Sequence, residues 1–176
     1  SNEIYVADGY RNRRVIVLDA MTFAFKRMWG AYGNKPDDTP LGPYNPDAPP
    51  AQQFRLPHNI AISRDGFVYV ADRPNNRIQV FTPDGKFVKE AFIAKRSLGE
   101  GAVWDIAFSK DAAQSHIYLA DGRNMKVRIL RRDTLEELTN FGDGGRQPGQ
   151  FYAPHSVAVD SKGNLYTVET YTGARV

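Results

Sequence analysis

A tetrapeptide that recurs four times limits the possible folds more than any other pattern in the sequence. Its tyrosines lie 64, 49 and 48 residues apart. Its copies are Tyr5-Val6-Ala7-Asp8, Tyr69-Val70-Ala71-Asp72, Tyr118-Leu119-Ala120-Asp121 and Tyr166-Thr167-Val168-Glu169. Self-similarity at a period of 40–50 residues is typical of architectures in which each copy folds as one supersecondary unit. The sequence therefore predicts a row of similar units.

The first interval is long because residues 31–53 form an insertion. This segment holds six of the chain's 11 prolines. Proline has no N–H to donate to a β-ladder, so the insertion is predicted to be a loop. The single predicted domain, 1–176, then divides into 1–30 (part of one unit), the insertion, 54–95 and 96–145 (complete units), and 146–176 (part of another).

Each complete unit contains four short segments of strand character. They are rich in Val, Ile, Phe and Tyr, and turn residues such as Asp65-Gly66 and Pro83-Asp84-Gly85 separate them. No segment shows the three-and-four spacing of apolar residues that a helix of ten or more residues needs. The expected strands are 58–63, 67–72, 77–82 and 87–93, then 103–109, 116–121, 126–131 and 137–142. Four strands repeating at this period predict an all-β protein made of β-propeller blades.

One stretch resembles an NHL repeat. It runs from Pro57-His58-Asn59-Ile60-Ala61-Ile62-Ser63 through Tyr69-Val70-Ala71-Asp72 to Asn76-Arg77-Ile78-Gln79-Val80-Phe81. The resemblance implies an NHL-type β-propeller of six blades, in which the first strand of each blade lines a central channel. The chain would hold three to four blades, beginning on a second strand at 4–8 and ending as a third strand begins at 174–176. It would be part of a longer chain, or copies would associate to complete a ring.

Composition excludes several classes of protein. There is no cysteine, which rules out disulfide scaffolds, thiolate zinc sites and cysteine nucleophiles. No apolar run approaches the ~20 residues that a membrane-spanning helix needs. The net charge of +3 neither demands nor forbids an anionic partner. The location in the cell cannot be read from the residues, although the resemblance favours an extracellular or periplasmic protein.

Two histidines occupy equivalent positions in units two apart. His58 follows Leu56-Pro57 and His155 follows Ala153-Pro154, whereas the intervening unit has Trp104 and Asp105 there. In a six-bladed ring these imidazoles would converge on the channel from two corners of a triangle, with the third corner outside this sequence. Three neutral imidazoles and an open position form a zinc site. We therefore take His58 and His155 as candidate zinc ligands, and Trp104 and Asp105 as candidate binding residues; alternatively, each histidine only donates a hydrogen bond to a neighbouring blade.

The loops after the second strands share one plan. They begin at Asp8, Asp72 and Asp121, and the first two end in arginine whereas the third ends in Lys126. The aspartate is expected to cap a turn and to receive the side chain of the final arginine. Tyr10 and Arg73 are not needed for that arrangement. Both are expected at the rim of the channel.

Tyr10, His58, Arg73 and His155 together resemble the site of the peptidyl-α-hydroxyglycine α-amidating lyases in residue type, order and loop length. The resemblance implies that Tyr10 acts as a base or stabilises an alkoxide, that Arg73 pairs with developing negative charge, and that the histidines hold zinc. The implied reaction cleaves a C-terminal α-hydroxyglycine into an amide and glyoxylate. One departure is Ser156, where the family has aspartate, and a further ligand and arginine of the family would lie upstream.

The leading interpretation is a propeller that binds a peptide, protein or glycan through its rim loops and channel, with Tyr32, Tyr44 and Asp47 of the insertion as candidate contacts. Whether the protein is an enzyme stays open. A calcium ion held by Asp37, Asp38 and Asp47 is a further hypothesis, although the spacing of an EF-hand is missing.

Single-stranded RNA binding is a second alternative. It would use a basic face with nearby tyrosines, and the 20 interspersed acidic residues argue against it. The arginines concerned are Arg11, Arg13, Arg14, Arg131 and Arg132.

Overall fold

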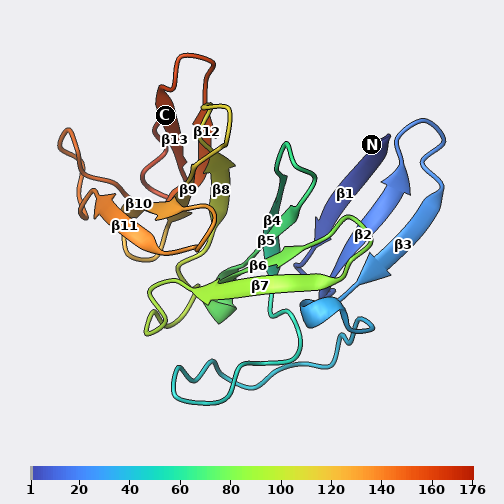
Figure 1. Cartoon of the computed structure of the whole chain (residues 1–176). Coiled ribbons are helices and arrows are strands. Elements are labelled where there is room, and N and C mark those ends of the chain that lie inside the picture. The colour runs from blue at the N-terminus through green and yellow to red at the C-terminus, as the bar shows by residue number, and fades with distance from the viewer. Residues whose placement is uncertain (1) are drawn as a thin grey trace.

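The chain folds as a series of antiparallel β-sheets (Figure 1). The computed structural model describes residues 2–176; Ser1, the first residue of the predicted first unit, lies outside the described part. The helical elements of residues 2–176 are two single 3₁₀ turns, η1 (Ala31–Gly33) and η2 (Arg73–Asn75). No helix in this range is both long and apolar enough to cross a membrane. The predicted all-β class is confirmed.

Two of the sheets are complete four-stranded blades, each paired in chain order. Their strands differ from the predicted bounds by two residues at most. The largest difference is at the strand predicted from 103, which begins at Asp105, whereas the predicted end residues Ser63 and Thr82 each belong to the following turn. The strands are β4 (Pro57–Ile62), β5 (Val68–Asp72), β6 (Arg77–Phe81), β7 (Phe87–Phe92), β8 (Asp105–Phe108), β9 (His116–Asp121), β10 (Lys126–Arg131) and β11 (Glu137–Phe141).

The other two sheets are smaller. One has three strands, β1 (Glu3–Asp8), β2 (Arg14–Asp19) and β3 (Phe25–Trp29), and the other has β12 (Pro154–Val159) and β13 (Leu165–Glu169). The expectation of a strand beginning at 174–176 is wrong. Ala174 has a φ of 46°, outside the β region. Within the described range 2–176, residues 174–176 make a single backbone hydrogen bond, in which the N–H of Glu169 donates to Arg175 O at 2.8 Å.

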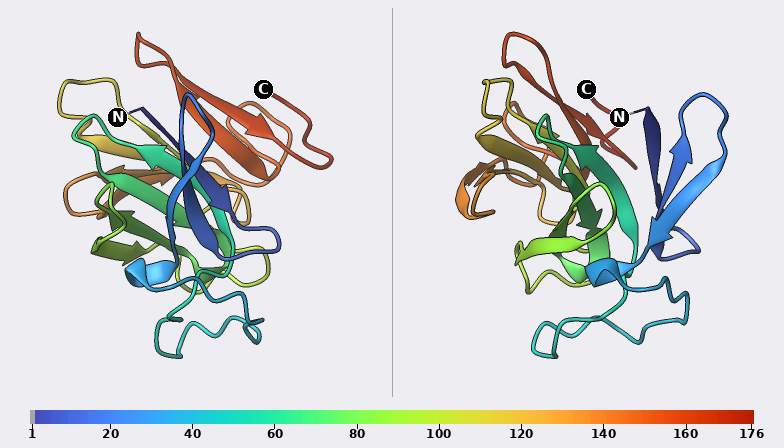
Figure 2. Two further views of the ribbon diagram at one scale, coloured as in Figure 1. Left: turned by 90° about the vertical axis from the view of Figure 1, so that its right-hand side faces the viewer. Right: turned by 45° about the vertical axis from the view of Figure 1, so that its right-hand side comes forward.

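Successive sheets pack face to face around their first strands. β4 packs against β8, and β8 against β12, while β1 lies beside β4 (Figures 1 and 2). Alternate residues of β5 enter different cores, as the period of two in a strand requires. Val68 and Val70 join the core shared with the first sheet, and Tyr69 and Ala71 join the core shared with the third. This packing brings equivalent positions of successive blades close together.

An acidic residue and an arginine form an ion pair in every sheet, at the end of the blade's second strand. The predicted pairing of the loop's final arginine with the aspartate is confirmed in the first two sheets. In the third sheet, where the loop ends in Lys126, that lysine donates to Gly142 O, and Arg128 pairs with the carboxylate. Residues two apart in a strand share a face, so Arg128 can replace position 126. The pairs are Asp8–Arg14 (2.9 Å), Asp72–Arg77 (2.9 Å), Asp121–Arg128 (2.7 Å) and Glu169–Arg175 (2.7 Å).

The insertion runs beneath the blade ends (Figure 2), and Tyr32 attaches its beginning to the second sheet. The Tyr32 hydroxyl donates to Glu90 at 2.8 Å and accepts from Arg77 at 3.0 Å. Burial, together with the hydrogen bond to Glu90, raises the pKa of Tyr32 to about 12. The structure therefore places the hydroxyl of this candidate contact in an internal network.

Replacing Tyr32 with phenylalanine is expected to loosen the insertion. The change leaves Glu90 and Arg77 without a shared partner and should lower the free energy of unfolding by about 1–3 kcal/mol. Limited proteolysis should then cleave residues 34–50 faster than in the unchanged protein. An unchanged cleavage rate would show that the insertion does not depend on this hydroxyl.

Candidate functional site

Five side chains, contributed by all four sheets and their loops, gather where the first strands meet. Tyr10 comes from the loop after β1, His58 and His155 are the second residues of β4 and β12, Arg73 follows β5, and Trp104 precedes β8. The ring centroids of His58 and His155 lie 4.8 Å apart, and those of Trp104 and His155 lie 5.3 Å apart. The Tyr10 ring lies 5.9 Å from His58. We call these five residues the channel cluster.

The backbone fixes the tautomer of His58. Its Nδ1 lies 2.6 Å from Trp104 O, and a carbonyl oxygen can only accept a hydrogen bond, so Nδ1 carries the proton. The lone pair is then on Nε2. Burial lowers the pKa of both His58 and His155, and the positive charge of Arg73 acts in the same direction. The pair is therefore neutral at neutral pH, which is the form that binds metals.

Trp104 forms the floor of the cluster. It is 2% exposed, and its Nε1 donates to Gly101 O at 2.6 Å. The guanidinium carbon of Arg73 lies 4.5 Å from the centre of the indole, a cation–π contact. Gly101 has a φ of 74°, and a β-carbon there would collide with the carbonyl oxygen of Arg73. Glycine is therefore required where the two segments cross.

Arg73 supplies a positive charge to the cluster. Its side chain is 6% exposed and pairs with the carboxylate of Glu100, which is 56% exposed. Burial lowers the pKa of Arg73, and the nearby phenols of Tyr10 and Tyr171 oppose that shift. Because Glu100 is accessible to solvent, an anionic ligand entering the cluster would compete with it for the guanidinium.

Asp105 links neighbouring blades. It is 6% exposed, and one carboxylate oxygen accepts from Val157 N at 2.9 Å and from the hydroxyl of Ser156. The other oxygen accepts from Ile106 N at 2.8 Å. The structure therefore places this candidate binding residue in a contact that orients β12 and with it His155.

Protonation of the two imidazoles should destabilise the fold. Their pKa values in the folded state lie below the ordinary 6.5, so the unfolded chain binds more protons in the interval between the two values. The free energy of unfolding should therefore be fully present above about pH 6.5 and should fall as the pH drops. Urea unfolding at about pH 7.5 and 5.5 measures this difference. In the His155→Asn variant the difference in unfolding free energy between the two pH values should be smaller. An equal difference in the variant and the unchanged protein would show that His155 does not cause the pH dependence.

The candidate residues of the insertion lie apart from the channel cluster. The Tyr44 hydroxyl donates to Lys95 O at 2.8 Å, and Asp47 pairs with Arg96 at 2.9 Å. Asp37 accepts from the N–H of Thr39 and Asp38 from that of Arg13, so the three carboxylates of the calcium hypothesis have separate partners. Within residues 2–176, no three or more His, Cys, Asp or Glu residues are grouped to hold a metal.

Three of the five arginines of the RNA hypothesis have partners within the chain. Arg13 donates to Arg55 O at 3.0 Å, Arg14 pairs with Asp8, and Arg132 pairs with Asp65 at 2.9 Å. These contacts neutralise or occupy guanidinium groups that phosphate binding would require.

Sequence reasoning missed Tyr171 and Glu100. Tyr171 follows Glu169 in the loop that corresponds to those of Tyr10 and Arg73, so its position in the repeat was a usable signal. Glu100 lies in an irregular segment between two blades. No pattern in the sequence distinguishes it from other surface glutamates.

Comparison with protein families identifies an NHL repeat at residues 54–81. The chain is 27% identical to peptidyl-glycine alpha-amidating monooxygenase B of Xenopus laevis over 180 residues, 99% of this chain and 18% of that protein. It is 26% identical to human (Homo sapiens) NHL repeat-containing protein 3, over 96% of this chain and 44% of that protein. It is 30% identical to a probable peptidyl-alpha-hydroxyglycine alpha-amidating lyase of Caenorhabditis elegans, over 70% of this chain and 36% of that protein. The chain thus spans less than half the length of each relative.

A solved structure shares the fold. Hydrazine synthase of Kuenenia stuttgartiensis superposes with a TM-score of 0.64 at 15% identity, covering 98% of this chain and 40% of that one. At this identity the likeness concerns the fold alone. The resemblance to NHL repeats and the similarity to amidating enzymes, at low identity, are both confirmed.

Proposed function

Because the chain folds as blades of an NHL-type β-propeller, we propose that its channel cluster is a metal-assisted lyase site for peptides that end in α-hydroxyglycine. The reaction would break the C–N bond of that residue and release a peptide amide and glyoxylate. One observation carries the proposal: His58, Arg73 and His155, which come from distant parts of the chain, gather around Trp104, and Tyr10 lies against His58. Similarity to amidating enzymes supports it.

The two histidines fit a zinc ion as part of its ligand set. His58 presents a bare Nε2 because its Nδ1 donates to a carbonyl, which is the usual second contact of a metal-binding histidine. Catalytic zinc sites take three protein ligands, so a third would join these two. Bound there, zinc would supply Lewis acidity and lower the pKa of the substrate hydroxyl.

Arg73 and Tyr10 would act on the substrate directly. The guanidinium of Arg73 would bind the carboxylate of the α-hydroxyglycine, with Glu100 displaced towards solvent. Tyr10, at 73% exposure, is accessible to an incoming peptide, and as a phenolate it would accept the proton of the substrate hydroxyl and then pass it to the leaving nitrogen. As the carbonyl forms, the electrons of the C–N bond pass to the amide nitrogen, which takes up a proton. The products are then a neutral amide and glyoxylate.

Glyoxylate release from a peptide ending in α-hydroxyglycine tests the proposal, together with metal analysis of the purified protein. We expect stoichiometric zinc and turnover. Tyr10→Phe should lower kcat by about 10²-fold or more, the contribution typical of a positioned acid or base, with little change in the unfolding free energy. The proposal is overturned if the protein releases no glyoxylate. It is also overturned if the protein holds less than one zinc ion per chain and its zinc content does not depend on the two histidines.

A binding scaffold is the second candidate. The exposed side chains of Tyr10 and Tyr171, at 73% and 66%, support recognition of a ligand at this rim without a reaction. Aromatic side chains on loops of a rigid scaffold are frequent binding residues. This candidate is distinguished by saturable peptide binding without glyoxylate, and by loss of a partner when residues 34–50 are deleted.

A further inference from the structure

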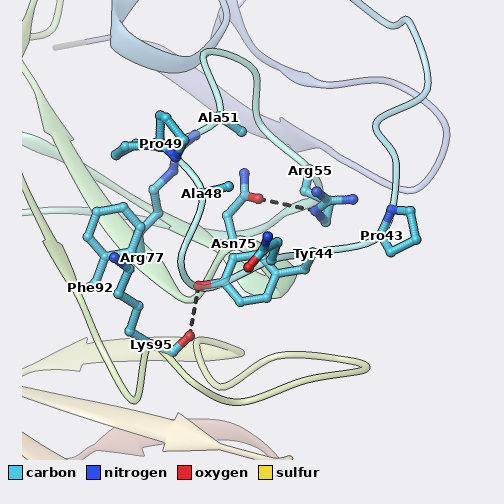
Figure 3. A pocket seen from close by; sticks show the side chains of 12 residues that line it. Pro43, Tyr44, Ala48, Pro49, Ala51, Arg55, Asn75, Arg77, Phe92 and Lys95 are labelled. Atoms are coloured by element: carbon cyan, nitrogen blue, oxygen red, sulfur yellow. Dashed lines mark hydrogen bonds between the residues drawn. The ribbon is translucent and has the colours of Figure 1, made fainter.

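The Pro-rich insertion encloses a cavity of about 140 Å³ against the second blade (Figure 3). The volume accommodates several water molecules and therefore a small organic ion. Pro49 and Phe92 lie on one side and Arg55 on the other, as Figure 3 shows. The cavity shares no residue with the channel cluster.

Polar contacts hold the insertion over this cavity. The Tyr44 hydroxyl donates to Lys95 O at 2.8 Å, and the Arg55 guanidinium donates to Gly42 O at 2.6 Å (Figure 3 shows the first). Asp47 and Arg96 form an ion pair at 2.9 Å outside it. Because these contacts attach the insertion at both ends of the cavity, the cavity is formed before any ligand binds, which lowers the entropic cost of binding.

The charges around the cavity are unbalanced. Its lining includes Arg55, Arg77 and Lys95 but no aspartate or glutamate. Arg77 is neutralised by Asp72 at 2.9 Å and Glu90 at 3.5 Å. The ion pairs of the described residues include neither Arg55 nor Lys95. Two cations therefore face the cavity without a carboxylate.

The contacts of these two cations are with neutral groups. Arg55 donates through Nε to Asn75 Oδ1 at 3.1 Å, and the Lys95 ammonium lies 5.3 Å from the centre of the Phe92 ring. Burial lowers the pKa of Arg55, and the neighbouring Arg13 and Arg77 add to the shift, although Asp72 opposes it. An anion in the cavity would relieve this unfavourable burial of positive charge.

We propose that this cavity is a binding site for a small organic carboxylate, with its charge at Arg55 and its apolar body against Pro49 and Phe92, on the side where the Lys95 ammonium lies. The Arg55 guanidinium supplies the donors that a carboxylate requires, and the Lys95 ammonium adds a second positive charge near the cavity. The proline, alanine and phenylalanine walls favour a ligand with an apolar body over a hydrated inorganic anion. The site is independent of the lyase proposal, since it contains none of the residues of the channel cluster.

Calorimetric titration with benzoate, benzamide and inorganic phosphate tests the site on the unmodified protein. We expect saturable binding of benzoate that weakens with added salt, and at least tenfold weaker binding of benzamide, which has the same shape and no charge. Phosphate is also expected to bind at least tenfold more weakly. Equal affinity for benzamide, equal affinity for phosphate, or no saturable binding of benzoate would each overturn the proposal.

A lysine substitution locates the binding in this cavity. Lys95→Met keeps the apolar stem, and the backbone carbonyl that holds Tyr44 is unchanged, so the fold should be retained. We expect benzoate affinity to fall about threefold, because the substitution removes a nearby positive charge but no direct contact with the carboxylate. Lys86→Met is the matched control, because Lys86 is 81% exposed on the turn before β7. Unchanged affinity in Lys95→Met, or an equal loss in both variants, would overturn the assignment.

Discussion

Replacing His58 with asparagine is expected to reduce kcat/KM for glyoxylate release by about 10³-fold or more, which corresponds to about 4 kcal/mol of transition-state stabilisation. The asparagine amide can still donate to Trp104 O in place of Nδ1, so the local hydrogen bond survives. The variant lacks Nε2, the atom that would bind the metal. Zinc content measured by mass spectrometry should fall with activity.

The control for this substitution is His116→Asn. His116 is half-buried at the start of β9 and lies outside the channel cluster. Both zinc content and glyoxylate release should be retained there. Full zinc occupancy and unchanged kcat/KM in His58→Asn would overturn the lyase proposal. If circular dichroism shows that His58→Asn does not fold, the same measurements on His155→Asn decide the question.

Replacing Asp72 with alanine is expected to lower the free energy of unfolding by about 3–5 kcal/mol, because the change leaves a buried charge without its partner. The side chains of Asp72 and Arg77 are both 0% exposed. Asp72 also accepts hydrogen bonds from the backbone N–H groups of Arg55 and Leu56 and from Asn75. Those donors would be buried without an acceptor in the variant.

The same motif in the first sheet is a matched control. Asp8 and Arg14 form an equivalent pair with side chains that are 26% and 27% exposed. Water can replace the lost contact there, so Asp8→Ala should cost about 1 kcal/mol or less. Urea unfolding of both variants measures the difference. Equal losses would mean that burial does not determine the strength of these pairs.

The gathering of the candidate residues could largely be predicted from the sequence because equivalent positions of the repeat meet in space. His58 and His155 have the same Pro-His context two units apart, and equivalent positions of propeller blades meet at the channel. Tyr10 and Arg73 stand out because the turns around them do not require them. The partners of these residues could not be predicted in the same way. Glu100 reaches Arg73 from an irregular segment, and no periodic pattern marks it.

The sequence by itself determined the all-β class, the four-strand units, their turns and the loop character of 31–53. These features depend on residues close together in the chain: alternation of side chains, turn residues and proline. Only the tertiary structure decided that Arg128 and not Lys126 pairs with Asp121, that Tyr32 joins an internal network, and that the insertion covers a cavity with two unpaired cations. Such contacts join segments distant in sequence, and packing chooses among several residues that could each have made them.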